Sequence, residues 1–141
     1  MSVFGVEGDA TTAARNGLKA ALETWRALDL LNENLAGELA APLRVGIGLH
    51  LGVAVVGWLP SSGTRSLQFL GDTGNIAAKL EAETKPLGCT MVASLASLTQ
   101  IAPLTADIET QVVPIPGKEQ PVPVAIFRNR DDLHRLVYPQ S

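Results

Sequence analysis

The sequence predicts an α/β sandwich in which helices pack on one face of a mixed, mainly antiparallel β-sheet. Helix-like and strand-like segments alternate along the chain, which is typical of two packed layers of secondary structure. Several strand-like segments are joined by connections too short for a parallel crossover, which favours antiparallel pairing. Hydrophobic residues make up 46% of the 141 residues and charged residues 18%, which is ordinary for a globular core.

A long amphipathic helix is predicted from about residue 9 to residue 40. Its core-facing positions recur three or four residues apart, at Leu18, Leu22, Trp25, Leu28, Leu31 (or Asn32), Leu35 and Leu39. Asp9 or Thr11 suits the N-cap position, and Pro42 ends the helical pattern. The apolar stripe predicts one amphipathic helix packed against the sheet, or two helices in line.

Short strands that contain several glycines are predicted in the first half of the chain. Residues 1–5 have the pattern of the end of a strand, and residues 43–49 and 53–58 have the pattern of two short strands. Glycines at positions 46, 48, 52 and 57 indicate bends or the close approach of another backbone. A turn at residues 60–64 leads into a further strand at residues 65–70.

The second half predicts one more long helix and a closing strand pair. The helix starts after a Gly-Asp turn, with Asp72 or Thr73 as its cap, and stops near Pro86 and Gly88. A buried strand at 90–93, a short helix at 94–102, and strands at 111–115 and 122–128 follow in that order. Residues 1–130 are predicted to form one domain, with a peripheral tail at 131–141.

Charge and hydropathy exclude two classes of function. The net charge is −3 and the basic residues are scattered, which argues against a nucleic-acid surface. No apolar run approaches the roughly 20 residues that a membrane-spanning helix needs, and no N-terminal signal pattern is present. We therefore expect a cytoplasmic domain without a membrane segment.

Cys89 is the sole cysteine and is interpreted as a small buried hydrophobe.

The most informative stretch runs from Arg65 to Glu81. It predicts a strand that carries Gln68, a tight turn, and a helix on which Asn75 and Lys79 stand four residues apart. Residues four apart share one face of a helix. An amide and an ammonium group on one face suit an anionic ligand.

This stretch and its neighbours resemble the catalytic domain of class III nucleotidyl (adenylate/guanylate) cyclases, in its C-terminal portion. The similar segments follow the family's order at residues 3–5, 42–52, 53–57, 71–81 and 117–122. The resemblance implies a ferredoxin-like sandwich that works as a homodimer or with another cyclase domain. It also implies a nucleoside triphosphate as the ligand.

The resemblance assigns roles to individual residues. Asn75 matches the Asn that orients the ribose, and Lys79 replaces the Arg that stabilises the transferred phosphate. Gln68 stands at the base-selecting position, and a Gln amide fits adenine or guanine. Lys118 is the candidate for the terminal phosphates, because Pro116 stands where the family often has Lys. Each of these side chains also fits a solvent-facing surface, and His50 is interpreted as a structural hydrogen-bonding residue.

The implied family activity converts ATP or GTP to a 3′,5′-cyclic nucleotide and pyrophosphate, with adenylate cyclase favoured. Family members use two Asp residues to hold Mg²⁺ or Mn²⁺, and both fall ahead of the matched region. We therefore expect no metal ligands and no tightly bound metal, and predict that this chain alone is inactive. The alternatives are a degenerate, non-catalytic module for dimerisation, regulation or nucleotide binding, and an unrelated ferredoxin-like regulatory domain. Without the family's first strand, neighbouring strands expose unpaired edges, which predicts self-association or marginal stability.

Overall fold

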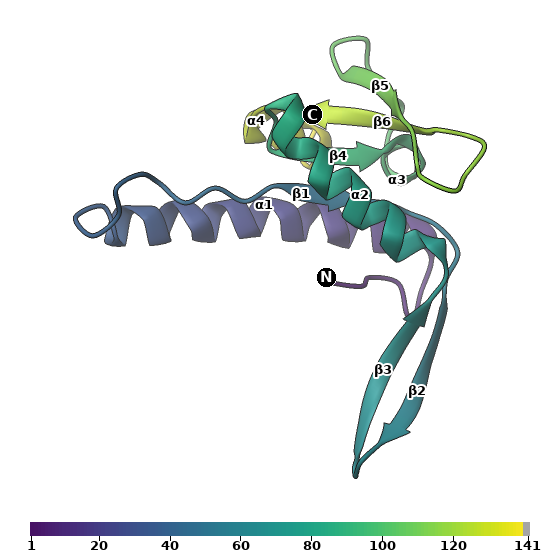
Figure 1. The fold of residues 1–141 in the computed structure, drawn as a ribbon. Helices are drawn as coiled ribbons and strands as arrows, with labels where there is room; N and C mark the ends of the chain where they lie inside the picture. The colour runs from purple at the N-terminus through teal and green to yellow at the C-terminus, as the bar shows by residue number, and fades with distance from the viewer. Residues whose placement is uncertain (140–141) are drawn as a thin grey trace.

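A four-stranded sheet with helices packed against it forms the body of the chain, and a long hairpin projects from it (Figure 1). The computed structural model describes residues 1–139. Its elements are α1 (Ala10–Asn34), β1 (Ile47–Leu49), β2 (Val55–Ser61), β3 (Thr64–Leu70), α2 (Asp72–Leu87), β4 (Met91–Ser94), α3 (Leu95–Leu98), β5 (Glu109–Val113), β6 (Val122–Phe127) and α4 (Arg130–Val137). The predicted fold class, a mixed and mainly antiparallel α+β arrangement, is confirmed.

The sheet has the strand order β1-β4-β6-β5. β1 pairs with β4 in parallel, whereas β4 with β6 and β6 with β5 are antiparallel. The closing strand pair predicted near residues 111–115 and 122–128 is therefore present as β5 and β6. Residues 1–5 contain no strand in the structure, although the sequence predicts the end of one there.

Helices cover both faces of this sheet, so the prediction that they lie on one face is wrong. On one face, Met91 and Ala93 of β4 belong to the core cluster that contains Leu18 and Trp25 of α1. On the other face, the intervening Val92 packs in a second cluster with residues of α2. Successive side chains of a strand point to opposite faces, so α1 and α2 must lie on opposite sides of β4.

The first helix is shorter than its sequence pattern predicts. Asp9 caps it by accepting a hydrogen bond from the Thr12 backbone N–H at 2.7 Å, as expected. The helix ends at Asn34, and the chain then returns along it. Asn32 fixes this return because its side chain exchanges two hydrogen bonds with the backbone of Leu43, at 2.8 and 3.0 Å.

The hairpin of β2 and β3 is a two-stranded sheet of its own. Its two-residue turn is Ser62-Gly63, and both residues have positive φ, which matches the twist that such short hairpins require. Most of its residues are exposed, including Trp58 and Leu70. Figure 1 shows the hairpin extending away from the body.

The last described segment is part of the core. The sequence predicts a peripheral tail at residues 131–141, but Arg130–Val137 form α4, and Leu133 and Val137 are buried against α1 and the sheet. Asn129 caps this helix by accepting from the Asp132 backbone N–H. Residues 140 and 141 lie outside the described residues.

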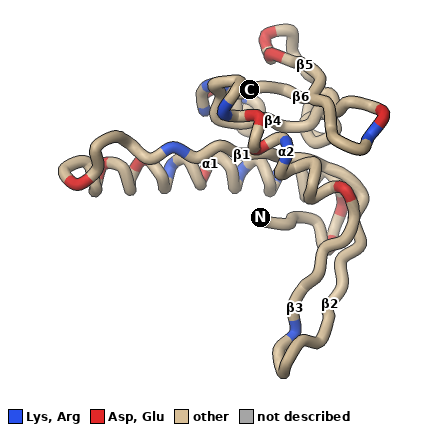
Figure 2. The backbone as a smooth tube through the Cα atoms, viewed as in Figure 1, with Lys and Arg blue, Asp and Glu red and all other residues tan. Residues whose placement is uncertain are grey.

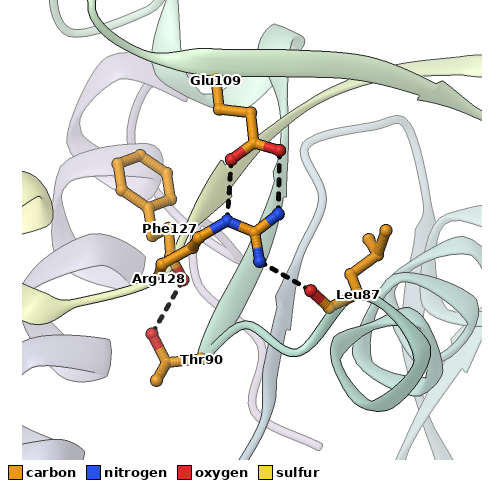
Figure 3. Close-up of polar contacts among 5 residues, drawn as sticks. All are labelled: Leu87, Thr90, Glu109, Phe127 and Arg128. Carbon is orange, nitrogen blue, oxygen red and sulfur yellow. Dashed lines mark hydrogen bonds and ion pairs between the residues drawn. The ribbon is translucent and has the colours of Figure 1, made fainter.

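A charged cluster fastens the end of the sheet to the end of α2 (Figure 3). The Arg128 guanidinium donates two hydrogen bonds of 2.9 Å to the Glu109 carboxylate, and this ion pair holds the pKa of Glu109 below its usual range. The same side chain donates to the Leu87 carbonyl at 2.7 Å. β5, β6 and α2 are thereby joined at one corner.

Among the described residues, no helix is long and apolar enough to cross a bilayer.

Candidate functional site

The polar face of α2 carries the first two candidate residues. Ile76 and Leu80 are buried and anchor the opposite side of the helix to the sheet. Asn75 is therefore left exposed, and Lys79 is half-buried one turn further along. The structure thus places these two residues on one face, as the spacing predicts.

The start of α2 is set by the backbone and not by an acidic cap. Gly71 is the N-cap residue with φ of +123°, and no side chain caps the helix there. The prediction that Asp72 or Thr73 caps it is wrong. Asp72 is the first helical residue, and the Thr73 hydroxyl donates instead to the Val53 carbonyl at 2.6 Å. That bond joins the start of α2 to the segment before β2.

Lys118 is brought to α2 by an ion pair. Its Nζ lies 3.0 Å from Oδ2 of Asp72, so the loop between β5 and β6 meets the first turn of the helix. The backbone N–H of Lys118 donates to the Ile115 carbonyl at 3.1 Å, which closes a turn that contains Pro116 and a left-handed Gly117. Lys118, from the loop between β5 and β6, therefore lies at the same end of α2 as Asn75.

Lys79 is also engaged by a carboxylate. Its Nζ lies 2.7 Å from Oε1 of Glu83, one helical turn towards the C-terminus. The Lys79 side chain is 36% exposed and the Glu83 side chain is 24% exposed, so this pair is partly shielded from water. Glu83 was not among the residues predicted for the site, although its spacing of four from Lys79 is the signal that predicts such a pair.

Gln68 lies in β3, which pairs with β2 in the hairpin. It stands opposite Gly57, so no side chain covers it from β2 at that register position. Its Nε2 donates to the Ser66 hydroxyl at 2.9 Å on the same strand. β3 leads directly into α2 through Gly71, but the hydrogen bond of Gln68 stays within the hairpin.

His50 lies between two hollows near these residues. One cavity of about 330 Å³ includes His50 and Thr73, and a groove of about 570 Å³ includes His50 and Lys118. Its Nδ1 is buried without a hydrogen-bond partner among the described residues, so the hydrogen bond expected of it is absent there. Burial, and then the positive charge of Lys118, lower the pKa of His50 below 6.5.

The described residues do not suit a divalent metal. No three of their His, Cys, Asp or Glu side chains gather closely enough to hold an ion. The carboxylates nearest the candidate residues, Asp72 and Glu83, are each engaged by a lysine. The arrangement brings together the Asn75 amide and two lysines that are each paired with a carboxylate.

Comparison with solved structures places this geometry in a known fold. The adenylyl cyclase CyaB from P. aeruginosa superimposes with a TM-score of 0.69 at 18% identity, over 92% of this chain and 67% of that one. The guanylyl cyclase Cya2 superimposes with a TM-score of 0.66 at 23% identity, over 87% and 61%. An adenylate cyclase of Anabaena cylindrica is 33% identical over 79 residues, which are 53% of this chain. The chain therefore has a cyclase-like fold.

The cyclase-like domain spans only part of these relatives. The matched region is 16% of the Anabaena cylindrica protein, and the chain covers about two thirds of the two structures. No family model matches the sequence. These neighbours therefore establish the fold of the chain.

Proposed function

We propose that this cyclase-like domain is the nucleotide-positioning portion of a nucleotide cyclase. The complete site converts ATP or GTP to a 3′,5′-cyclic nucleotide and pyrophosphate. The observation that supports this proposal is the shared polar face of α2, where Asn75 and Lys79 follow Gln68 of β3 in the order of the cyclase signature. The likeness to adenylyl and guanylyl cyclase structures supports the same conclusion.

Each candidate residue has a distinct task in this reaction. The ribose 3′-hydroxyl attacks the α-phosphate, so catalysis depends mainly on positioning and on neutralising charge. The Asn75 amide orients the ribose, and Lys79 supplies a point charge to a phosphate oxygen. Gln68 can both donate to and accept from a base edge. The preference for adenine therefore rests on the adenylate cyclase relative and not on Gln68.

The charge neutralisation is incomplete in this portion. Family members use Mg²⁺ or Mn²⁺ on two aspartates, and residues 1–139 contain no cluster that fits such ions. Lys79 also lacks the planar fork of Arg, and losing one such donor costs about 3 kcal/mol of transition-state stabilisation in comparable sites. We infer that this chain does not cyclise a nucleotide unless another polypeptide segment supplies the metal carboxylates.

The second candidate function is a non-catalytic module for dimerisation, regulation or nucleotide binding. Two features favour it. Pro116 provides neither a charge nor an N–H where a phosphate-binding Lys is expected. Both remaining cations of the site are paired with carboxylates of the chain itself.

We propose that the partner is a second copy or another cyclase domain. The hairpin of β2 and β3 exposes large apolar side chains, and two-stranded hairpins are marginally stable by themselves. Burial against a partner would stabilise the hairpin. Its base adjoins α2, so a partner there would also face the candidate residues.

The first test incubates the purified chain with ATP or GTP and Mn²⁺ and measures cyclic nucleotide by mass spectrometry. We expect no product above the protein-free control. Product formed by the chain and abolished by Asn75→Ala would overturn the proposed inactivity, because contaminating cyclase would not respond to that change.

A complementation assay then separates the two candidate functions. The chain is mixed with a class III cyclase domain that keeps its metal aspartates but has its own signature Asn and Arg replaced by Ala. Product from the mixture, lost again with Asn75→Ala, supports the nucleotide-positioning role. A soluble complex that yields no product supports the non-catalytic module.

A further inference from the structure

Four polar residues follow one another along the exposed face of α2. Asp72, Asn75, Lys79 and Glu83 are spaced by three or four positions, so they form one stripe. Lys118 joins the stripe at its first residue through the 3.0 Å contact with Asp72. The two lysines and two carboxylates sum to zero formal charge.

The two ion pairs differ in shielding. The side chain of Glu83 is 24% exposed, whereas that of Asp72 is 69% exposed. Solvent and salt screen an exposed pair more strongly than a partly shielded one. Glu83 therefore restrains Lys79 more than Asp72 restrains Lys118.

The position of Glu83 also decides where the ammonium group points. Asn75 lies one turn before Lys79, and Glu83 lies one turn after it. The 2.7 Å contact fixes Nζ at the Glu83 end of the stripe. Among the described residues, no hydrogen bond joins Lys79 to Asn75. A phosphate that also contacts Asn75 must draw the ammonium away from Glu83.

We propose that Glu83 is a positioning residue that holds Lys79 in the unliganded site and competes with the phosphate groups of a nucleoside triphosphate. The proposal rests on the proposed function, because it takes Lys79 as the phosphate contact. The triphosphate binds only when its oxygens replace the Glu83 carboxylate as the partner of the Lys79 ammonium group. Glu83 thus lowers phosphate affinity while it keeps the lysine on the correct face of α2.

Glu81→Gln is the matched control for Glu83→Gln. Glu81 lies on the same helix, is exposed, and makes no ion pair within residues 1–139. Both substitutions change the net charge of the chain by the same amount, so general attraction of anions rises equally. A difference between them isolates the contact with Lys79.

The experiment titrates inorganic tripolyphosphate into the isotopically labelled chain and follows α2 amides by NMR at low salt. We expect Glu83→Gln to bind about three- to five-fold more tightly than Glu81→Gln, the factor that a weak ion pair provides. The advantage should shrink in high salt and disappear when Lys79→Met is also present. Thermal unfolding of each variant verifies the fold.

The outcomes separate this inference from the proposed function. Equal affinities of the Glu83→Gln and Glu81→Gln variants, or an advantage that persists with Lys79→Met, overturn the role of Glu83. If Lys79→Met binds as tightly as the unmodified chain, Lys79 is not the phosphate contact and the proposed function fails at that residue. Absence of binding in every variant overturns both.

Discussion

The imidazole of His50 lies in a setting that disfavours its protonated form. Its Nδ1 is buried without a partner, and Lys118 adds a positive charge nearby. Both effects oppose protonation in the folded chain. The unfolded chain has neither constraint, so its His50 takes up a proton near the ordinary pKa of 6.5. Protonation of His50 therefore favours the unfolded state.

We predict that the free energy of unfolding falls as pH decreases from about 7.5 to about 5.5. The contribution of neutral His50 to stability is fully present above its unfolded-state pKa of 6.5. It is lost as pH falls towards the lower pKa of His50 in the folded state. Urea unfolding at both pH values measures the loss, and His50→Gln should remove it. His134→Gln is the control, in which the contribution of His50 remains. An undiminished pH dependence in His50→Gln would contradict the prediction.

Acidic residues act in a different range of pH. Asp9 and Glu109 have lowered pKa values because a backbone N–H and Arg128, respectively, stabilise their ionised forms. Their contribution is present above the ordinary carboxylate pKa and is lost only as pH falls below about 4. The range chosen for His50 therefore leaves these carboxylates ionised.

At the scale of elements, α2 lies unusually close to β1. A Cβ atom on Gly48 would stand 2.3 Å from both the Ala77 carbonyl oxygen and the Glu81 nitrogen. A Cβ on Gly46 would stand 2.1 Å from the Thr84 hydroxyl. Glycine at position 48 lets the backbone of α2 rest directly on β1, and glycine at position 46 leaves room for the Thr84 side chain just before that strand. Together they set the height of the candidate residues above the sheet.

Gly48→Ala should therefore destabilise the chain by about 1–3 kcal/mol, the usual cost of forcing an extra group into a packed interface. Backbone atoms of α2 would have to move, and the stripe that carries Asn75 would move with them. Gly57→Ala in β2 is the control, because a Cβ on Gly57 would meet no atom within 4 Å. Urea unfolding compares the two, and equal stabilities would refute the direct contact.

Several elements could be predicted because their signals are local. The three- and four-residue period and the Asp9 cap identify α1, and the Ser62-Gly63 turn lies within the predicted turn at 60–64. The glycine run predicts close backbone approach or bends. Gly48 confirms such an approach, whereas a Cβ on Gly46 would meet the Thr84 side chain and one on Gly57 would meet nothing within 4 Å. The spacing of Asn75 and Lys79 predicts their common face.

The remaining features depend on contacts distant in sequence. β4 is buried on both sides, so its side chains show no alternation that would indicate which helix covers which face. The apolar runs of β2 and β3 look like core strands, yet the hairpin projects from the body. The pairing of Lys118 with Asp72 joins a late loop to an earlier helix, which no local pattern reveals.

At the scale of the whole molecule, charge is unevenly distributed (Figure 2). Acidic and basic residues are mixed over the body, whereas the hairpin shows one basic position near its tip, which the sequence identifies as Arg65. Apolar side chains dominate the hairpin surface, with Trp58 exposed to 64%. β1 is moreover an outer strand of the sheet. Unpaired edges and uncharged apolar surfaces both promote association.

We predict that the chain associates with itself through the hairpin and that Trp58→Lys weakens the association at least ten-fold. A charge at this position would have to be desolvated in an apolar interface, which costs more than the loss of the ring's contacts alone. Leu30→Lys on α1 is the matched control, since Leu30 is 58% exposed but lies outside the hairpin. Sedimentation velocity over a range of concentrations measures the dimer fraction. A monomer at every concentration, or equal weakening by Leu30→Lys, would show that the hairpin is not the contact between copies.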